Sequence, residues 1–219
     1  MKDERLNIGV LISGRGSNLQ AIIDGIEKGE VAATISVVIS NKPDAYGLER
    51  ARSHRIPAKV VDNRGFETRE AFESQLIKTL KGHGAELIVL AGFMRILTPY
   101  FLNAFPGKVV NIHPALLPAF PGVGVQEKAA EYGVRFSGCT VHFVDEGVDA
   151  GPIIAQAVVP VFPTDTGEVL SDRILKMEHQ VYPRVINWLA KGKVRLEGRR
   201  VFVEGAKVNE ETAFIEPFL

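Results

Sequence analysis

The sequence predicts an α/β fold with a mostly parallel, twisted sheet and helices on both of its faces. Two observations carry this prediction. Runs rich in β-branched residues alternate with amphipathic stretches through the first half of the chain, which is typical of βαβ units whose strands are buried on both faces. Later, at residues 137–144 and 152–161, two such runs follow one another around a glycine-containing loop, which predicts an antiparallel addition towards the carboxyl terminus.

The elements of the first half can be assigned in order. We expect a strand where a short apolar run stands between turn residues, and a helix where apolar residues recur at roughly three or four positions. The expected strands lie at residues 7–13, 33–41, 58–61, 86–92 and 107–114. The expected helices lie between them at residues 17–29, 44–55 and 67–84. The last helix has one apolar face, and Gly82 is expected to end it.

The second half contains a short helix at residues 125–133, the two strands already named, and a long helix from about Thr166 to Ala190. Pro183 is expected to kink this long helix. The sequence VRLEGRRVFV then predicts a terminal hairpin.

Composition limits the kind of protein. At 219 residues, with 46% hydrophobic residues and no repeat or low-complexity tract, the chain can bury a sizeable core. We expect a single domain over residues 1–219, in which residues 190–219 form the terminal hairpin and a variable tail.

Charge and cysteine usage exclude several function classes. The 26 Lys and Arg balance the 26 Asp and Glu, so the chain has no overall attraction to nucleic acid or to a membrane surface. The single cysteine, Cys139, excludes an internal disulfide and a multi-cysteine metal site. The first apolar run is too short for a signal peptide or a membrane helix. We therefore expect a cytoplasmic monomer or homodimer that binds small molecules and no metal.

The strongest indication of function lies in NIHPALLPAFPG, residues 111–122, and in the later VDAGP. In an extended strand Asn111 and His113 project from the same face, and Pro114 keeps the histidine extended. An imidazole and an amide NH2 can together stabilise a developing oxyanion in acyl transfer. A carboxylate from Asp149 would align the imidazole and favour its protonated form. These three residues are therefore candidate catalytic residues, with the nucleophile supplied by a substrate.

Each of the three also has a purely structural interpretation. Asn111 could cap a turn, His113 could be a core histidine with satisfied hydrogen bonds, and Asp149 could close an Asx-turn before Gly151. Their joint occurrence among so many glycines and prolines favours the functional interpretation.

A second candidate site is the glycine-rich turn SGRGSNLQ after the first strand. Free N–H groups and the positive dipole at the start of the next helix favour a phosphate held by Gly16, Ser17 and Asn18. A compatible alternative makes Ser17 or Asn18 the N-cap of that helix. A dinucleotide site is less well supported, because the third glycine of the usual pattern falls at Leu19 and no acidic residue ends the second strand.

Two further segments admit more than one interpretation. The residues from Phe93 to Leu97 mix apolar side chains with Arg95 at the edge where α/β sheets bind ligands, and a flat apolar ligand would fit there. They could equally be the buried start of a helix. From its pattern alone, Glu178 on the long helix indicates a solvated charge. His142, in the strand TVHFV, shows no metal-ligand spacing.

With these motifs assembled, the chain resembles the phosphoribosylglycinamide formyltransferase family, and the resemblance spans about Asn7 to Ala190. The motifs that carry it are VLISGRGSNLQAII, SNKPDAYGLERA, LAGFMRIL, NIHPALLPAFPG, TVHFVDEGVDAGPII and EHQVYP. The resemblance implies a Rossmann-like formyltransferase fold. It also implies an enzyme that moves a formyl group from 10-formyltetrahydrofolate, its co-substrate, to the amine of glycinamide ribonucleotide in de novo purine biosynthesis.

The resemblance implies roles for individual residues. Asn111, His113 and Asp149 match the catalytic positions. The positions that match the ribonucleotide site are Gly16, Ser17, Asn18 and Glu178. The positions that match the folate site are Arg69, Met94, Arg95, Ile96, Leu97, Asn111, Asp145, Glu146, Gly147 and Val148. The implied mechanism is direct attack of the substrate amine on the formyl carbon through a tetrahedral intermediate, with water carrying the proton to the folate nitrogen.

The chain departs from the family at Gly124, where many members carry a histidine, and this removes an imidazole near the substrate. Two other functions remain open. A formyltetrahydrofolate deformylase would use a similar trio with water as the nucleophile, and it usually carries an additional N-terminal domain, for which we expect no room before the first strand. A non-catalytic phosphate-binding or nucleotide-binding module would be favoured by loss of the trio, which is intact here.

Overall fold

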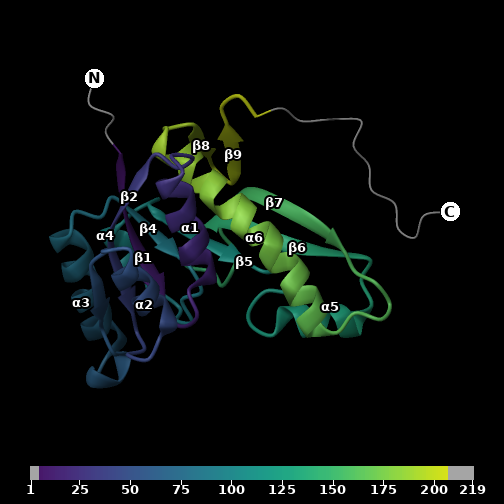
Figure 1. Ribbon diagram of the computed structural model, residues 1–219, viewed down its shortest axis with the longest axis horizontal. Helices are drawn as coiled ribbons and strands as arrows, with labels where there is room; N and C mark the ends of the chain where they lie inside the picture. The colour runs from purple at the N-terminus through teal and green to yellow at the C-terminus, as the bar shows by residue number, and fades with distance from the viewer. Residues whose placement is uncertain (1–4, 207–219) are drawn as a thin grey trace.

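The computed structural model describes residues 5–206 as a seven-stranded sheet with helices on both faces (Figure 1). The strands of the sheet are β1 (Leu6–Ile12), β2 (Ala33–Ser40), β3 (Ala58–Val60), β4 (Leu87–Leu90), β5 (Val109–His113), β6 (Phe136–Phe143) and β7 (Ile153–Pro160). The helices are α1 (Ser17–Glu27), α2 (Tyr46–Ser53), α3 (Arg69–Gly82), α4 (Pro99–Ala104), α5 (Val125–Tyr132) and α6 (Gly167–Ala190). A separate hairpin is formed by β8 (Val194–Glu197) and β9 (Arg200–Val203).

The strand order in the sheet is β3-β2-β1-β4-β5-β6-β7. The first five strands pair in parallel, whereas β6 runs antiparallel to β5 and β7 antiparallel to β6. The predicted α/β fold with an antiparallel addition is therefore confirmed. Because the strand order reverses between β1 and β4, their carboxyl ends flank the crevice in which open α/β sheets bind ligands.

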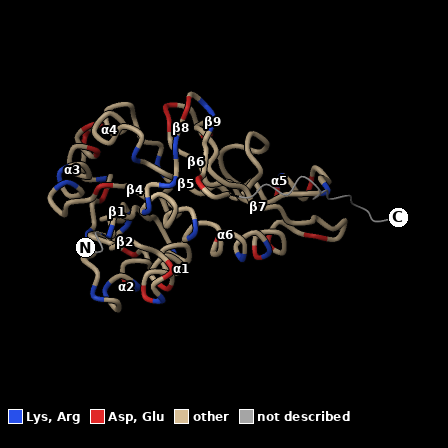
Figure 2. Tube along the Cα trace, turned by 90° about the horizontal axis from the view of Figure 1, so that it is seen from above, with Lys and Arg blue, Asp and Glu red and all other residues tan. Residues whose placement is uncertain are grey.

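Side-chain alternation divides the core between the two faces of the sheet. Ile8, Val10 and Ile12 of β1 belong to a buried cluster that includes residues of α1, α2 and α6. Leu11 belongs instead to a second cluster, which includes residues of α3 and α4. Figure 2 shows these two groups of helices along opposite sides of the sheet. All four side chains are fully buried, which explains why β1 is a continuous apolar run in the sequence.

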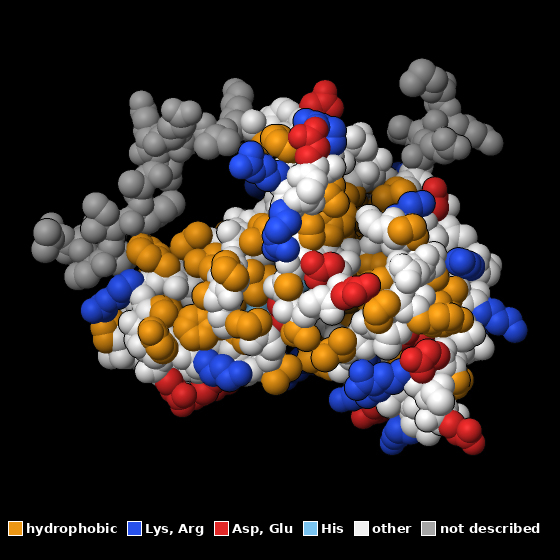
Figure 3. Space-filling view, turned by 180° about the vertical axis from the view of Figure 1, so that it is seen from behind, with side chains coloured by type: hydrophobic (Ala, Val, Ile, Leu, Met, Phe, Trp, Pro, Cys, Tyr) orange, Lys and Arg blue, Asp and Glu red, His pale blue; other side chains and the backbone are white. Residues whose placement is uncertain are grey.

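The two faces are covered differently over the antiparallel half of the sheet. Helix α6 packs against β6 and β7 on one face. On the other face, the second cluster includes no buried residue of β6 or β7 among the described residues. Figure 3 views this face, across which hydrophobic side chains gather. Here Ala115 and Leu117, in the irregular segment after β5, bond to Thr140, so this segment lies over β6.

Some local predictions need correction. Gly82 does not end α3 as a left-handed cap; it is the last helical residue, and the positive φ of 69° falls at Gly84. Helix α4 was not predicted, because it has only six residues and opens with Pro99. Helix α6 is one continuous helix of 24 residues that contains Pro183, and the kink expected there stays a prediction. The part of the predicted tail at 207–219 lies outside the described residues.

Charged residues of both signs occur together around the helices (Figure 2), in keeping with the balanced composition. Over residues 5–206, none of the helices has the length and apolar character needed to cross a membrane.

Candidate active site

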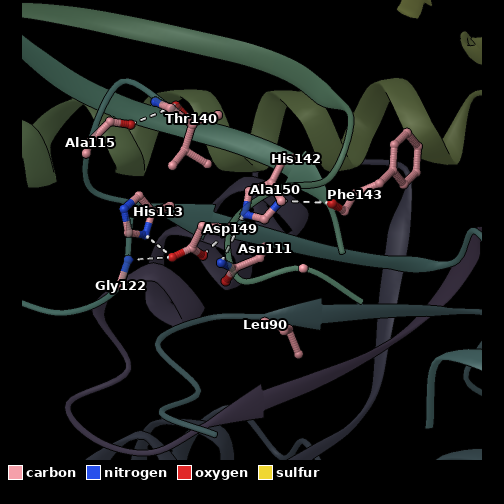
Figure 4. A network of polar contacts seen from close by, with 12 residues as sticks. Leu90, Asn111, His113, Ala115, Gly122, Thr140, His142, Phe143, Asp149 and Ala150 are labelled. Carbon is pink, nitrogen blue, oxygen red and sulfur yellow. Dashed lines mark hydrogen bonds and ion pairs between the residues drawn. The ribbon is translucent and has the colours of Figure 1, made fainter. Parts of the chain in front are cut away.

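The three predicted catalytic residues meet at the carboxyl end of β5 (Figure 4). Asn111 and His113 lie two positions apart in β5, so they share one face of the sheet. The neighbouring antiparallel strand places His142 opposite Asn111 and Thr140 opposite His113. Asp149 comes from the loop between β6 and β7.

Asp149 connects the segments that form this site. Its Oδ2 accepts a hydrogen bond from Gly122 N at 2.8 Å and lies 3.4 Å from His113 Nδ1, while its Oδ1 lies 3.8 Å from His142 Nε2. The carboxylate therefore accepts a hydrogen bond from a residue 27 positions away. An Asx-turn would instead bond to the backbone of a residue close by in the sequence. Its backbone is left-handed, with a φ of 51°, and non-glycine residues in such conformations collect at functional sites.

His113 is buried, with 4% of its surface exposed. Its Nε2 lies 2.8 Å from the carbonyl oxygen of Phe120, and its Nδ1 faces the Asp149 carboxylate. Carbonyl and carboxylate oxygens only accept hydrogen bonds. Both ring nitrogens therefore face acceptors, an arrangement that suits a doubly protonated imidazolium.

His142 belongs to the same network, although its sequence pattern gave no sign of a role. Its Nδ1 donates to the carbonyl oxygen of Phe143 at 2.8 Å, which leaves Nε2 to accept from Asn111 Nδ2 at 3.3 Å. Burial lowers the pKa of His142, against the opposing effects of the Phe143 hydrogen bond and the Asp149 charge. A neutral His142 thus fixes which end of the Asn111 amide carries the NH2 group. Only the pairing of β5 with β6 could have revealed it.

The proline-rich segment after His113 is held by hydrogen bonds to the Thr140 side chain of β6. The Thr140 hydroxyl donates to Ala115 O at 2.7 Å and accepts from Leu117 N at 3.0 Å. Gln156 of β7 donates to Leu117 O at 2.9 Å and to the same hydroxyl at 3.0 Å. These bonds fix the path of the chain from His113 towards Gly122, whose N–H contacts Asp149.

The glycine-rich turn before α1 differs from the predicted alternative for the N-cap of this helix. The N-cap of α1 is Gly16, with a φ of 70° and no side-chain cap, so the alternative that Ser17 or Asn18 caps the helix is wrong. A Cβ atom at Gly16 would lie 2.7 Å from Gly47 Cα, so both the backbone angle and the packing require glycine. Ser17 and Asn18 are the first two helical residues, and N–H groups there have no partner within the helix and favour an anion.

Asn18 also reaches Glu178 of α6, which is 6% exposed rather than solvated as its pattern indicated. Asn18 Nδ2 donates to Glu178 Oε2 at 2.7 Å, while the buried Asn18 Oδ1 has no hydrogen-bond partner. Burial raises the pKa of Glu178, and the Asn18 hydrogen bond and the nearby His113 oppose this shift. An acceptor-rich pair of this kind suits a ligand that brings N–H or O–H donors.

The predicted folate residues differ in exposure. Met94 and Ile96 are 63% and 60% exposed, whereas Leu97 packs into the cluster with α3 and α4. The segment is not the start of a helix, because α4 begins only at Pro99. Exposed positions also include Arg69, the first residue of α3, and Glu146, Gly147 and Val148; Asp145 and Arg95 are half-buried.

At Gly124 the structure gives a reason for the departure noted above. Gly124 is the N-cap of α5 with a φ of 67°, a left-handed conformation that side chains other than glycine rarely adopt. A histidine could not take this backbone conformation without strain.

This arrangement combines an amide NH2 donor and an imidazolium charge with the acceptor-rich pair of Asn18 and Glu178 and a helix N-terminus, groups that suit acyl transfer between two small molecules. The chain belongs to the formyl transferase family, whose model matches residues 6–186. It is 43% identical over 203 residues to the phosphoribosylglycinamide formyltransferase of Escherichia coli (strain K12), covering 93% of this chain and 96% of that protein.

A longer relative and a solved structure agree with this family. The chain is 50% identical over 194 residues to the trifunctional purine biosynthetic protein adenosine-3 of Chironomus tentans, of which it spans only 14%. It superposes with a TM-score of 0.90, at 50% identity and covering 93% of this chain and 95% of the other, on glycinamide ribonucleotide transformylase 1 from Symbiobacterium toebii.

Proposed function

We propose that this chain transfers the formyl group of 10-formyltetrahydrofolate to the amine of glycinamide ribonucleotide, a step of de novo purine biosynthesis. The observation that carries the proposal is the meeting of Asn111, His113 and Asp149 at one end of β5 in a member of the formyl transferase family. The near full-length similarity to a phosphoribosylglycinamide formyltransferase supports the choice of substrates. A cytoplasmic location, expected from the single cysteine, belongs to the same proposal.

The ribonucleotide fits the polar side of the site. The N-terminus of α1, at Gly16, Ser17 and Asn18, suits its phosphate. The free Asn18 Oδ1 and the Glu178 carboxylate suit donors on its ribose or its amine.

The folate fits the other side. Its formyl carbon is the electrophile, and its flat ring system suits the exposed apolar side chains of Met94 and Ile96 and the loop at residues 145–148. Arg69 and Arg95 supply positive charge for its carboxylates. No metal is needed, since the formyl oxygen can be stabilised by hydrogen-bond donors alone.

The residues of the chain act on the formyl oxygen as the amine attacks. Asn111 donates from its NH2 group, and the positive charge of the His113 imidazolium lies beside this donor, so the negative charge that develops on the oxygen meets one hydrogen-bond donor and one fixed cation. Asp149 keeps the imidazole aligned through the 3.4 Å contact with Nδ1. The tetrahedral intermediate then breaks the bond between the formyl carbon and the folate nitrogen, and water carries the proton from the amine to that nitrogen.

The test is an absorbance assay of 10-formyltetrahydrofolate deformylation, run with and without glycinamide ribonucleotide, together with detection of formylated product. Turnover that requires the ribonucleotide is the expected result. Release of formate without the ribonucleotide would instead indicate the hydrolase, and absence of turnover in both conditions would indicate the binding module.

In the same assay, Asn111→Ala should lower kcat by about a hundredfold to a thousandfold, because one oxyanion donor is removed. Full activity of this variant would contradict its proposed role.

A further inference from the structure

Buried and partly buried hydrogen bonds run along the carboxyl edge of the sheet. Met94 N donates to Ser13 Oγ at 2.8 Å, Ser13 Oγ donates to Asn41 Oδ1 at 2.6 Å, and Asn41 Nδ2 donates to Asn63 Oδ1 at 2.9 Å. We call these four residues the edge relay. Met94 follows β4, Ser13 follows β1, Asn41 follows β2 and Asn63 follows β3. The strand order β3-β2-β1-β4 therefore brings them into line.

The groups of the edge relay have complementary donor and acceptor roles. Ser13 and Asn41 are each 4% exposed, so water does not readily replace their partners. A serine hydroxyl has one proton, which Ser13 gives to Asn41, and this leaves its lone pairs for the Met94 N–H. Ser13 N also donates to Gly92 O at 3.0 Å. Ser13 thus holds the chain after β4 at two points, Gly92 and Met94.

Ser13 stands between two segments that the proposed function assigns to different substrates. It directly precedes the turn at Gly14–Asn18, and its hydroxyl holds the first residue of Met94–Leu97. We propose that Ser13 is a positioning residue that fixes the folate-binding segment against the ribonucleotide-binding turn. This inference rests on the proposed function, because that function gives each segment its substrate.

Loss of the hydroxyl should act on folate binding before it acts on chemistry. Met94 N and Asn41 Oδ1 would both lose a partner, and among the described residues no other side-chain hydrogen bond holds residues 94–97. The relay makes no hydrogen bond to Asn111, His113 or Asp149. The catalytic geometry should therefore survive while the folate segment is displaced.

The experiment compares Ser13→Ala, Asn41→Ala and the unaltered enzyme in steady-state kinetics with both substrates varied. We expect the KM for 10-formyltetrahydrofolate to rise about five- to tenfold in Ser13→Ala, with a smaller rise in Asn41→Ala, which keeps the Met94 bond. The KM for the ribonucleotide and kcat should change by less than about threefold. The matched control is Ser36→Ala, which removes a serine hydrogen bond to Ile8 O in the middle of the sheet.

Calorimetric titration of tetrahydrofolate into each variant gives a readout that does not depend on turnover. A weakened affinity in Ser13→Ala and not in Ser36→Ala supports the positioning role. An unchanged folate affinity, or an equal loss of affinity for both substrates, overturns it. If Ser13→Ala does not fold, the same comparison with Asn41→Ala decides the question. An unaltered enzyme that binds folate but does not formylate the ribonucleotide would contradict the proposed function instead.

Discussion

Asp149 combines a left-handed backbone, with a φ of 51°, and a carboxylate shared between His113 and the Gly122 amide. Asparagine tolerates this backbone conformation as well as aspartate does. It can also accept the Gly122 hydrogen bond through its amide oxygen. A single substitution at this residue can therefore separate the charge of the side chain from its shape.

Asp149→Asn should keep the fold and lower kcat by about a hundredfold or more, because the imidazolium of His113 loses its charged partner. The pH profile of kcat should change with it. Steady-state assays over a range of pH, with thermal unfolding as the check on folding, would measure both effects. Asp172→Asn, on the exposed surface of α6, is the matched control. Unchanged rates in Asp149→Asn would remove this residue from the mechanism.

Glu178 makes a prediction about stability and pH. An unfolded glutamate loses its proton near 4.5, and burial raises the pKa of Glu178 in the folded protein. Between these two values the folded state binds more protons than the unfolded state, so this residue lowers stability as pH rises through the window. In Glu178→Gln that fall should be absent, while the KM for the ribonucleotide rises about tenfold or more. Melting temperatures of the unaltered protein and of Glu178→Gln, measured from pH 4 to 8, test the prediction on stability, and steady-state kinetics test the prediction on KM. If the melting temperatures of the two proteins change with pH in parallel, the prediction on stability is refuted.

At the scale of elements, the paired strands β5 and β6 carry the site, and Thr140 ties the segment after β5 to them. Thr140→Val keeps the shape but leaves Ala115 O, Leu117 N and the Gln156 amide with fewer partners. We expect a loss of about 1–3 kcal/mol in the free energy of unfolding and a reduced kcat. Urea denaturation measures the first quantity. Thr34→Val, at an exposed position of β2, should change neither the free energy of unfolding nor kcat. If both variants show the same values, Thr140 does not support the segment after β5.

The elements show where sequence reasoning succeeded. Alternation placed Asn111 and His113 on one face, and the two consecutive strands predicted the antiparallel half of the sheet; both hold in the structure. Local patterns could not supply pairing between distant elements. His142 becomes visible only through its register with Asn111, and α4 is too short to show a period.

The same limit explains two other residues. Glu178 has the pattern of a surface glutamate, and only the packing of α6 on α1 buries it beside Asn18. Arg199, at the turn of the terminal hairpin, donates to Ala150 O at 2.7 Å beside the Asp149 position, although that part of the sequence suggested no role. Contacts that depend on tertiary docking leave no periodic trace in the sequence.

At the scale of the whole molecule, α6 joins the two halves of the sheet. Tyr182, which is fully buried, places its hydroxyl 2.9 Å from Leu90 O and 3.2 Å from Val110 O, on the neighbouring strands β4 and β5. Burial raises the pKa of Tyr182 well above its usual value, so the hydroxyl remains a donor. The helix is thereby fixed over the strands that end at the site.

Tyr182→Phe should lower the free energy of unfolding by about 1–2 kcal/mol, and the melting temperature by about 2–8 °C, because buried carbonyl oxygens lose a donor. Tyr132→Phe, at a side chain that is 79% exposed, should leave the melting temperature unchanged. Calorimetry of the two variants decides the matter, and identical curves would mean that the hydroxyl contributes nothing.

The contact between Asn18 and Glu178 joins residues that are 160 positions apart. During synthesis the ribosome adds roughly 5–20 residues each second, so the glycine-rich turn leaves it many seconds before its partner on α6. The growing chain can form the first parallel strands in that time, but the pair of Asn18 and Glu178 is completed only when α6 arrives. The ribonucleotide binding that we propose would therefore be acquired late by the nascent protein, only when α6 docks.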